Sequence, residues 1–131
     1  MSTQPTALEL TEIVFPEHTN HYGTLFGGNA LLLMSKAAFL AGRAFAGSNV
    51  VMASVSDAQF LMPVRVGSVL RLCARVSRVG RTSMSICVTG TAQPLGDAPA
   101  VALKALFEMV AVDGDGRPAS IPDAYLIKET A

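Results

Sequence analysis

Hydrophobic residues are spaced along this chain in two ways, one typical of a helix and the other typical of strands. Residues 29–45 are rich in Ala, Leu and Met and contain no proline, which favours a helix. Their polar residues recur every seven positions, at Asn29, Lys36 and Arg43, and form one narrow stripe. Because the rest of the circumference is almost entirely apolar, we expect this helix to be buried, and Gly47 is a suitable residue to end it.

Most of the remaining chain alternates with a period of two, which indicates strands. The segments expected to be strands are residues 8–14, 49–60, 68–79, 83–92 and 101–112. The link of Gly80 and Arg81 is too short for a crossover, so the strands on either side of it must form a hairpin. The last segment is apolar on both faces apart from Lys104 and Glu108, which predicts a central strand.

The order of these elements predicts the fold class. A single apolar helix among strands joined by short turns has to be covered by an antiparallel sheet. We therefore expect an α+β protein with a five-stranded antiparallel sheet wrapped around one long central helix. Such a sheet leaves one edge open and one face uncovered, which favours a homodimer with a continuous sheet.

Length and charge narrow the possibilities further. The chain of 131 residues suits one domain, with residues 1–7 and 123–131 peripheral. Ten basic residues balance ten acidic ones, so nothing favours nucleic acid or an anionic membrane as a partner, and an anionic ligand would need a local basic cluster. Residues 1–7 do not form a signal peptide, and residues 30–46 are too short and too charged to span a bilayer, so we expect a soluble cytoplasmic protein.

The two cysteines lie in apolar segments that read as strands. Cys73 and Cys87 lack the spacing of metal ligands, and we expect them to be buried free thiols in a reducing compartment. No metal and no cofactor are expected.

Residues 14–28 read V-F-P-E-H-T-N-H-Y-G-T-L-F-G-G, with an asparagine, a spacer and a glycine pair just before the helix. Further matching segments, in the same order, are residues 50–54, 60–67, 79–84 and 107–118. Together they resemble the signature of the bacterial hotdog-fold acyl-CoA thioesterases, which are similar to eukaryotic cytosolic acyl-CoA hydrolases. The resemblance covers residues 10–122. It implies a hotdog fold, active sites between paired subunits, hydrolysis of acyl-CoA to free acid and CoA, and often a hexamer built as a trimer of dimers.

Two features of the segment before the helix suit thioester hydrolysis. Gly27 and Gly28 would let a substrate carbonyl approach the unpaired amides of the helix N-terminus, which could stabilise a developing oxyanion by about 3 kcal/mol. The alternative is that these glycines serve tight helix packing. Asn20 matches the family asparagine that orients water or the thioester, but it could instead cap its own turn.

The chain departs from the family pattern at the catalytic acid. The resemblance places an aspartate, sometimes a glutamate, where this chain has Ser35. A neutral hydroxyl cannot act as a general base, and it could be a nucleophile only beside a base. Alternatively, Ser35 bonds to a backbone carbonyl one turn back. Glu17 and Asp57, from this subunit or its partner, are possible substitute acids, although each could equally be a solvated surface carboxylate.

Other residues supply candidates for binding and for a different reaction. Arg81, Thr82 and Ser83, with Arg65 and also Lys104, could hold the phosphates of CoA, or the first three could form an ordinary hairpin turn. The apolar residues Phe60, Leu61 and Met62 could line an acyl channel or belong to the core. A pair of His18 or His21 with an acid would suit an enoyl-CoA hydratase, but the histidine motif of that class is not matched.

Two functions of different class therefore remain open. The first is an active acyl-CoA thioesterase whose acid is relocated or whose rate is weakened. The second is a degenerate hotdog protein that binds acyl-CoA, or pairs with an active paralogue, without hydrolysing the thioester. The segment before the helix favours the first, and Ser35 favours the second.

Overall fold

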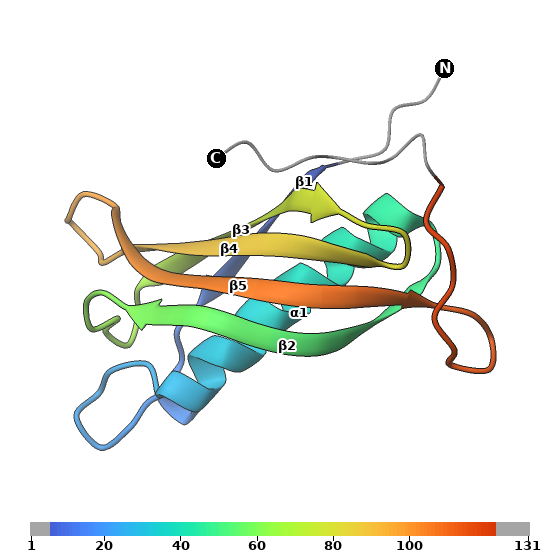
Figure 1. Cartoon of the computed structure of the whole chain (residues 1–131). Helices are drawn as coiled ribbons and strands as arrows, with labels where there is room; N and C mark the ends of the chain where they lie inside the picture. Colours follow the sequence, from blue (N-terminus) through green and yellow to red (C-terminus); the bar gives the residue numbers. More distant parts are fainter. Residues whose placement is uncertain (1–5, 123–131) are drawn as a thin grey trace.

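One helix lies against the concave side of a single curved sheet (Figure 1). The structure, a computed structural model, describes residues 6–122. The elements in chain order are β1 (Ala7–Ile13), the short 3-10 helix η1 (Pro16–His18), α1 (Gly27–Ala46), β2 (Asn49–Phe60), β3 (Val69–Val79), β4 (Ser83–Gln93) and β5 (Ala100–Val112). The predicted α+β class and all predicted elements are confirmed, with boundaries that shift by one or two residues at most.

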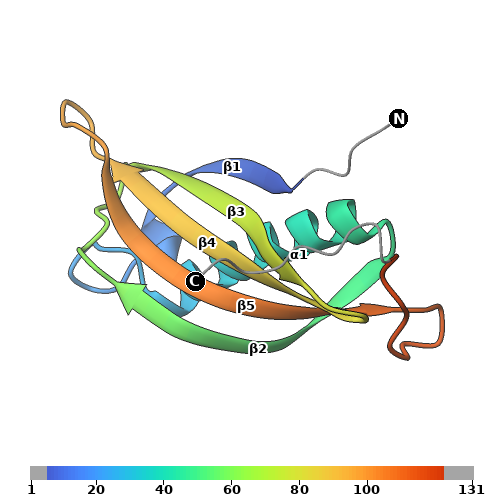
Figure 2. The same ribbon diagram turned by 45° about the horizontal axis from the view of Figure 1, so that its top comes forward.

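All neighbouring strands pair antiparallel in the order β1-β3-β4-β5-β2. The hairpin predicted around Gly80 and Arg81 joins β3 to β4, and β5 occupies the predicted central position between β4 and β2. Strands β1 and β2 form the two edges, and the sheet bends around α1 so that both edges curve toward the helix (Figure 2).

Residues 1–5 and 123–131, most of the two ends predicted to be peripheral, lie outside the described residues. Ala7 does belong to the sheet, and Thr6 is hydrogen-bonded to it. Ala7 begins β1 opposite Arg75, and the carbonyl of Thr6 accepts a hydrogen bond from the Val76 amide at 2.8 Å.

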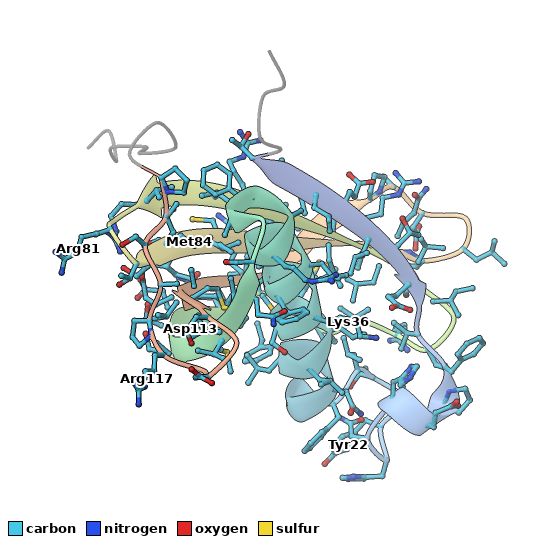
Figure 3. All side chains as sticks on the ribbon, turned by 90° about the vertical axis from the view of Figure 1, so that its right-hand side faces the viewer. Tyr22, Lys36, Arg81, Met84, Asp113 and Arg117 are labelled. Carbon is cyan, nitrogen blue, oxygen red and sulfur yellow. The ribbon has the colours of Figure 1, made fainter. Side chains whose placement is uncertain are left out.

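The core fills the space between the sheet and one face of α1. The sheet contributes large side chains with no more than 2% exposure, among them Leu70, Leu72, Met84, Ile86 and Phe107. The helix contributes mostly small residues, which are Ala30, Ala37, Ala38, Ala41 and Gly42. A Cβ at Gly42 would lie 3.1 Å from Cδ1 of Ile86, so the glycine permits close approach of the helix to β4. Figure 3 shows Met84 pointing from β4 toward the helix.

The prediction that α1 is buried around nearly its whole circumference is wrong for a single chain. The sheet covers only one side, and Leu32 and Phe39 on the other side are 61% and 38% exposed. The unpaired edge strand β2 is also exposed along residues 51–60, including the apolar side chains of Met52 and Val55. An uncovered apolar strip therefore runs along α1 and β2, as expected for a surface that a second copy would cover.

The cysteines are free thiols, but the prediction that both are buried is wrong. Cys87 is exposed and Cys73 is only partly buried. Both residues lie on the outer face of the sheet, opposite the face that packs on α1, and no second layer of the described residues covers them. Among residues 6–122, no helix is long and apolar enough to cross a membrane.

The packing predicts a large difference between two leucine truncations. Leu72→Ala should lower the free energy of unfolding by about 2–5 kcal/mol, because Leu72 is fully buried in the core. Leu95→Ala is the matched control and should change it by less than about 0.5 kcal/mol, because Leu95 is 100% exposed. Urea unfolding followed by circular dichroism measures both, and equal losses would contradict this description of the core.

Candidate active site

The segment between β1 and α1 is shaped by Asn20. Its side-chain oxygen accepts hydrogen bonds from the amide of Tyr22 at 2.9 Å, the amide of Thr24 at 3.3 Å and the hydroxyl of Thr24 at 3.2 Å. The Asn20 amide also donates to the Thr24 carbonyl at 2.9 Å. The alternative that Asn20 caps its own turn is therefore confirmed for its oxygen, while its side-chain NH₂ has no partner among residues 6–122.

Backbone hydrogen bonds fix this segment against the chain that leads into β3. Leu25 donates to the Val64 carbonyl at 2.7 Å, and Val66 donates to the Gly23 carbonyl at 3.0 Å. The carbonyl of His18 accepts from the Phe26 amide at 2.9 Å and from the Asn29 side chain at 3.0 Å. These hydrogen bonds, made on both sides of Phe26, fix the position at which α1 begins.

The first turn of α1 keeps three backbone amides without a protein acceptor. The first helical hydrogen bond runs from the Ala30 amide to the Phe26 carbonyl at 2.9 Å. Phe26 is the N-cap residue and supplies no side-chain acceptor, and the first turn contains no acidic residue. Within the described chain, the amides of Gly27, Gly28 and Asn29 are consequently unpaired donors at the positive end of the helix dipole.

One cavity places Gly27 beside the predicted acyl channel. This cavity of about 340 Å³ is lined by Gly27 together with Phe60, Leu61 and Met62, and also by Leu25, Ala30, Pro63, Val64 and Leu103. Space is available next to the glycine, since a Cβ there would lie 3.8 Å from the Phe60 ring, an ordinary contact distance. The structure thus brings Gly27 together with the three apolar residues, which the sequence had singled out on separate grounds.

A second cavity contains Gly28 and Ser35. It has a volume of about 420 Å³ and is otherwise lined by Leu31, Leu32, Met52, Val55, Ala58 and Phe107. The Ser35 hydroxyl donates to the Leu32 carbonyl at 2.8 Å, so the predicted alternative of a bond to the preceding turn is confirmed. No lining residue of this cavity is titratable, and Ser35 therefore has no base beside it there.

The candidate acids and histidines line neither cavity and form no pair with one another. Glu17 is exposed in the first turn of η1, and Asp57 is exposed in β2. His18 accepts a hydrogen bond at Nδ1 from the Phe15 amide at 3.2 Å, and the ring of His21 stacks on Tyr22 at 3.9 Å. The described residues therefore contain no histidine–acid pair of the kind a hydratase would need, and no cluster of metal-binding side chains.

The candidate CoA-binding residues do not form one group within a single chain. Arg65 pairs with Thr24 beside the start of α1, whereas Arg81 and its neighbours form the β3–β4 turn at the opposite end of the sheet. Figure 3 shows Tyr22, in the segment before α1, and Arg81 well apart. Lys104 is exposed on the outer face of β5.

The sequence did not predict that Phe26 and Asn29 shape the start of α1. Phe26 leaves the first amides of α1 uncapped, and its ring carbon Cε2 lies 2.9 Å from where a Cβ on Gly28 would stand. The available signal was the absence of a Ser, Thr, Asp or Asn at the position before the glycine pair, because those residues usually satisfy the first amides.

Comparison with known proteins agrees with this geometry. A model of the thioesterase superfamily matches residues 22–98. The acyl-CoA thioester hydrolase YciA of Escherichia coli is 34% identical over 119 residues, which cover 88% of this chain and 90% of that protein.

The chain belongs to the thioesterase superfamily, among the acyl-CoA thioester hydrolases.

Solved acyl-CoA hydrolases have the same hotdog fold. An acyl-CoA hydrolase of Staphylococcus aureus, solved with butyryl-CoA, CoA and CoA disulfide, has a TM-score of 0.85 and 28% identity, covering 95% of this chain and 75% of that one. A hexameric acyl-CoA thioesterase has a TM-score of 0.87 and 32% identity, covering 95% of this chain and 79% of that one. In this member of the family, the uncapped helix start and the two cavities beside it form the candidate active site.

The contacts of Asn20 predict that mutation can separate the structural role of its oxygen from any role of its NH₂ group. Asn20→Ala should lower the free energy of unfolding of this thioesterase by about 1–2 kcal/mol, because the turn loses its acceptor. Asn20→Asp keeps an acceptor oxygen and should stay close to wild type. Urea unfolding of both variants checks this, and an unchanged Asn20→Ala variant would rule out the structural role.

Proposed function

We propose that this protein hydrolyses acyl-CoA thioesters to a free acid and CoA at the start of α1. The observation that supports this most is the group of unpaired amides at Gly27, Gly28 and Asn29, next to a cavity lined by apolar side chains. A thioester carbonyl seated there would receive hydrogen bonds that strengthen as negative charge develops on its oxygen. The acyl chain would extend along Phe60, Leu61 and Met62, which match it in polarity.

Asn20 would act through the half of its side chain that the turn leaves free. Its oxygen is occupied by Tyr22 and Thr24, so its NH₂ group is the part available to orient water or the thioester. Because three accepted hydrogen bonds hold the side chain in place, the NH₂ group would be positioned before substrate arrives.

The CoA portion would be held by two chains. In a homodimer joined antiparallel through the open edge of β2, the partner's sheet is reversed end for end. The β3–β4 turn of the partner then lies at the end of the dimer where this chain has Arg65 and the start of α1. Arg65 and the turn residues Arg81, Thr82 and Ser83 would bind the phosphates from opposite sides, which supports the dimer as the smallest active unit. A hexamer built as a trimer of dimers would be compatible with this arrangement, because the related thioesterase is hexameric.

The second candidate function is binding of acyl-CoA without hydrolysis. It is favoured by Ser35, which stands where the family resemblance places an acid and whose hydroxyl is engaged with the Leu32 carbonyl. A thiol-release assay against acyl-CoAs of increasing chain length decides between the two. Hydrolysis of any of them by wild type supports the proposed function, whereas calorimetric binding with no thiol release supports the second.

Gly27 offers a matched pair of variants for the oxyanion site. Gly27→Pro removes the amide hydrogen but suits the first position of a helix, and Phe26 already has the extended backbone, with φ −68° and ψ 136°, that precedes proline. We expect kcat to fall by about 10²–10³-fold. Gly27→Ala keeps the amide and should retain activity, since its Cβ meets only an ordinary contact. Equal activity of the two variants in the thiol-release assay would remove the Gly27 amide from the mechanism.

Ser35 allows a gain-of-function test. Ser35→Asp would place a carboxylate in the cavity with Gly28, and we expect faster thiol release because a base then stands beside the substrate. Ser35→Ala is the control and should match wild type, because the hydroxyl only bonds to its own helix. A strong loss in Ser35→Ala would show that the hydroxyl itself takes part.

A further inference from the structure

We propose that Leu103, seated against Gly90, forms the floor of the cavity beside Gly27 and sets the length of the acyl chain that this protein accepts. This inference rests on the proposed function, which places the acyl chain in that cavity, and it adds the residues that select among acyl-CoAs. Leu103 would contact the end of the acyl chain. Gly90 does not line the cavity and would act through Leu103, as a positioning residue.

Four residues form one row across the sheet, and the row ends beside the start of α1. Leu72 of β3 pairs with Gly90 of β4, which pairs in turn with Leu103 of β5. Leu103 pairs on its other side with Phe60 of β2. The Phe60 ring lies next to Gly27, since a Cβ on that glycine would stand 3.8 Å from it. The row therefore leads from the interior of the sheet to the proposed oxyanion site.

The cavity has a buried floor and an exposed rim. Its lining residues Ala30, Val64 and Leu103 are all buried within this single chain. Phe60 and Leu61, which line it as well, are each half exposed in one chain. Because the rim residue Phe60 lies beside the helix start, an acyl chain that enters there would run inward and end against the buried residues.

A bulge in β5 directs Leu103 into the cavity. The register of β4 with β5 shifts by one residue after Gly90, so Ala102 is an extra residue on β5. Ala102 and Leu103 are consecutive and yet both buried, which the regular alternation of a strand would not give. The Ala102 carbonyl accepts a hydrogen bond from the Leu61 amide at 2.7 Å, which ties the bulge to the rim of the cavity. Bulges commonly redirect a side chain beside an active site.

Gly90 gives the Leu103 side chain room to stand back from the cavity. A Cβ on Gly90 would lie 3.1 Å from both Cβ and Cδ1 of Leu103 and 3.3 Å from its Cγ. These distances are shorter than ordinary contacts, so the leucine would have to move by a few tenths of an ångström. The cavity is the empty space that Leu103 adjoins, and a side chain at Gly90 would therefore make it shallower.

The lining of the cavity favours an aliphatic chain and disfavours one that is too long. The side chains that line it carry no hydroxyl, amide or charge, so a hydroxyl or carboxylate on the acyl group would be buried there without a partner. Protein interiors tolerate little overfilling, and a chain longer than the cavity would have to displace Leu103. Each methylene that an apolar pocket accepts or rejects changes kcat/KM by about 10-fold or more. A small change in the floor should therefore change the preferred chain length.

Two variants should move the preferred chain length in opposite directions. Leu103→Ala deepens the cavity, and kcat/KM for the next longer even-numbered acyl-CoA should rise about 10-fold or more relative to that for the wild-type optimum. Gly90→Ala should favour the next shorter acyl-CoA by a similar factor. Leu72→Ala is the matched control, because Leu72 lies on the other side of Gly90 in the same row and lines neither cavity of the candidate site. Leu103→Val and Leu72→Val are the milder pair if either alanine variant does not fold.

The assay is thiol release by the full chain from saturated acyl-CoAs of increasing length, with thermal unfolding to show that each variant is folded. A longer optimum in Leu103→Ala, a shorter one in Gly90→Ala and an unchanged one in Leu72→Ala support the proposal. An unchanged optimum in either of the first two variants overturns it. The same shift in Leu72→Ala also overturns it, because the effect would then be a general loss of packing. So does a shift confined to Leu31→Ala, which enlarges the cavity with Gly28 and Ser35.

Binding measurements separate failure of this proposal from failure of the proposed function. If wild type releases no thiol from any acyl-CoA, the proposed function fails. Calorimetry with unreactive S-alkyl-CoA thioethers of the same lengths then tests the floor of the cavity without hydrolysis. Kd ratios that shift toward longer chains in Leu103→Ala and toward shorter chains in Gly90→Ala support the role of these residues, and unshifted ratios overturn it.

Discussion

The site depends on one constraint, which is that hydrogen bonds hold the chain in place at the first turn of α1 while that turn lacks a cap. Most helices satisfy their first amides with a polar N-cap side chain. Here the N-cap is Phe26, whose amide donates to the His18 carbonyl, so the chain is held firmly just before the helix while the next three amides remain free. The helix dipole adds partial positive charge at the same point. In our proposal, these backbone amides alone recognise the negative charge that develops on the substrate oxygen.

The remainder of the fold holds this helix start in place. Small residues on the inner face of α1 bring the helix close to β3, β4 and β5, and the Asn20 turn with its bonds to Val64 and Val66 ties the preceding segment to the sheet. The other face of α1 and the edge strand β2 remain uncovered in one chain. The cavity with Gly28 and Ser35 is lined by Leu32, Met52 and Val55 from this uncovered side. A site of this kind therefore belongs to paired subunits in our proposal.

Periodicity predicted the strands, the helix and their boundaries well, because alternation reports which side chains face a core. Periodicity failed to predict burial where burial depends on whether a partner subunit or a second layer covers the residue. The helix was expected to be enclosed and the cysteines buried, since an apolar residue looks the same whether the sheet or a partner covers it. Gly27 was singled out by the family resemblance, and Phe60, Leu61 and Met62 by their apolar character, but the cavity that they share was not predicted. The bulge in β5 gave no sequence signal, and the occupied oxygen of Asn20 follows only from the folded turn.

The most direct measurement of the central claim is the amide signals of Gly27, Gly28 and Asn29 by nitrogen-15 NMR, with two unreactive CoA conjugates. One conjugate is a ketone that keeps the acyl oxygen with a methylene in place of sulfur, and the other is a thioether that lacks this oxygen. The account predicts that the ketone shifts at least one of these three amides strongly downfield while the thioether, bound equally, does not. Identical spectra with the two conjugates would contradict it.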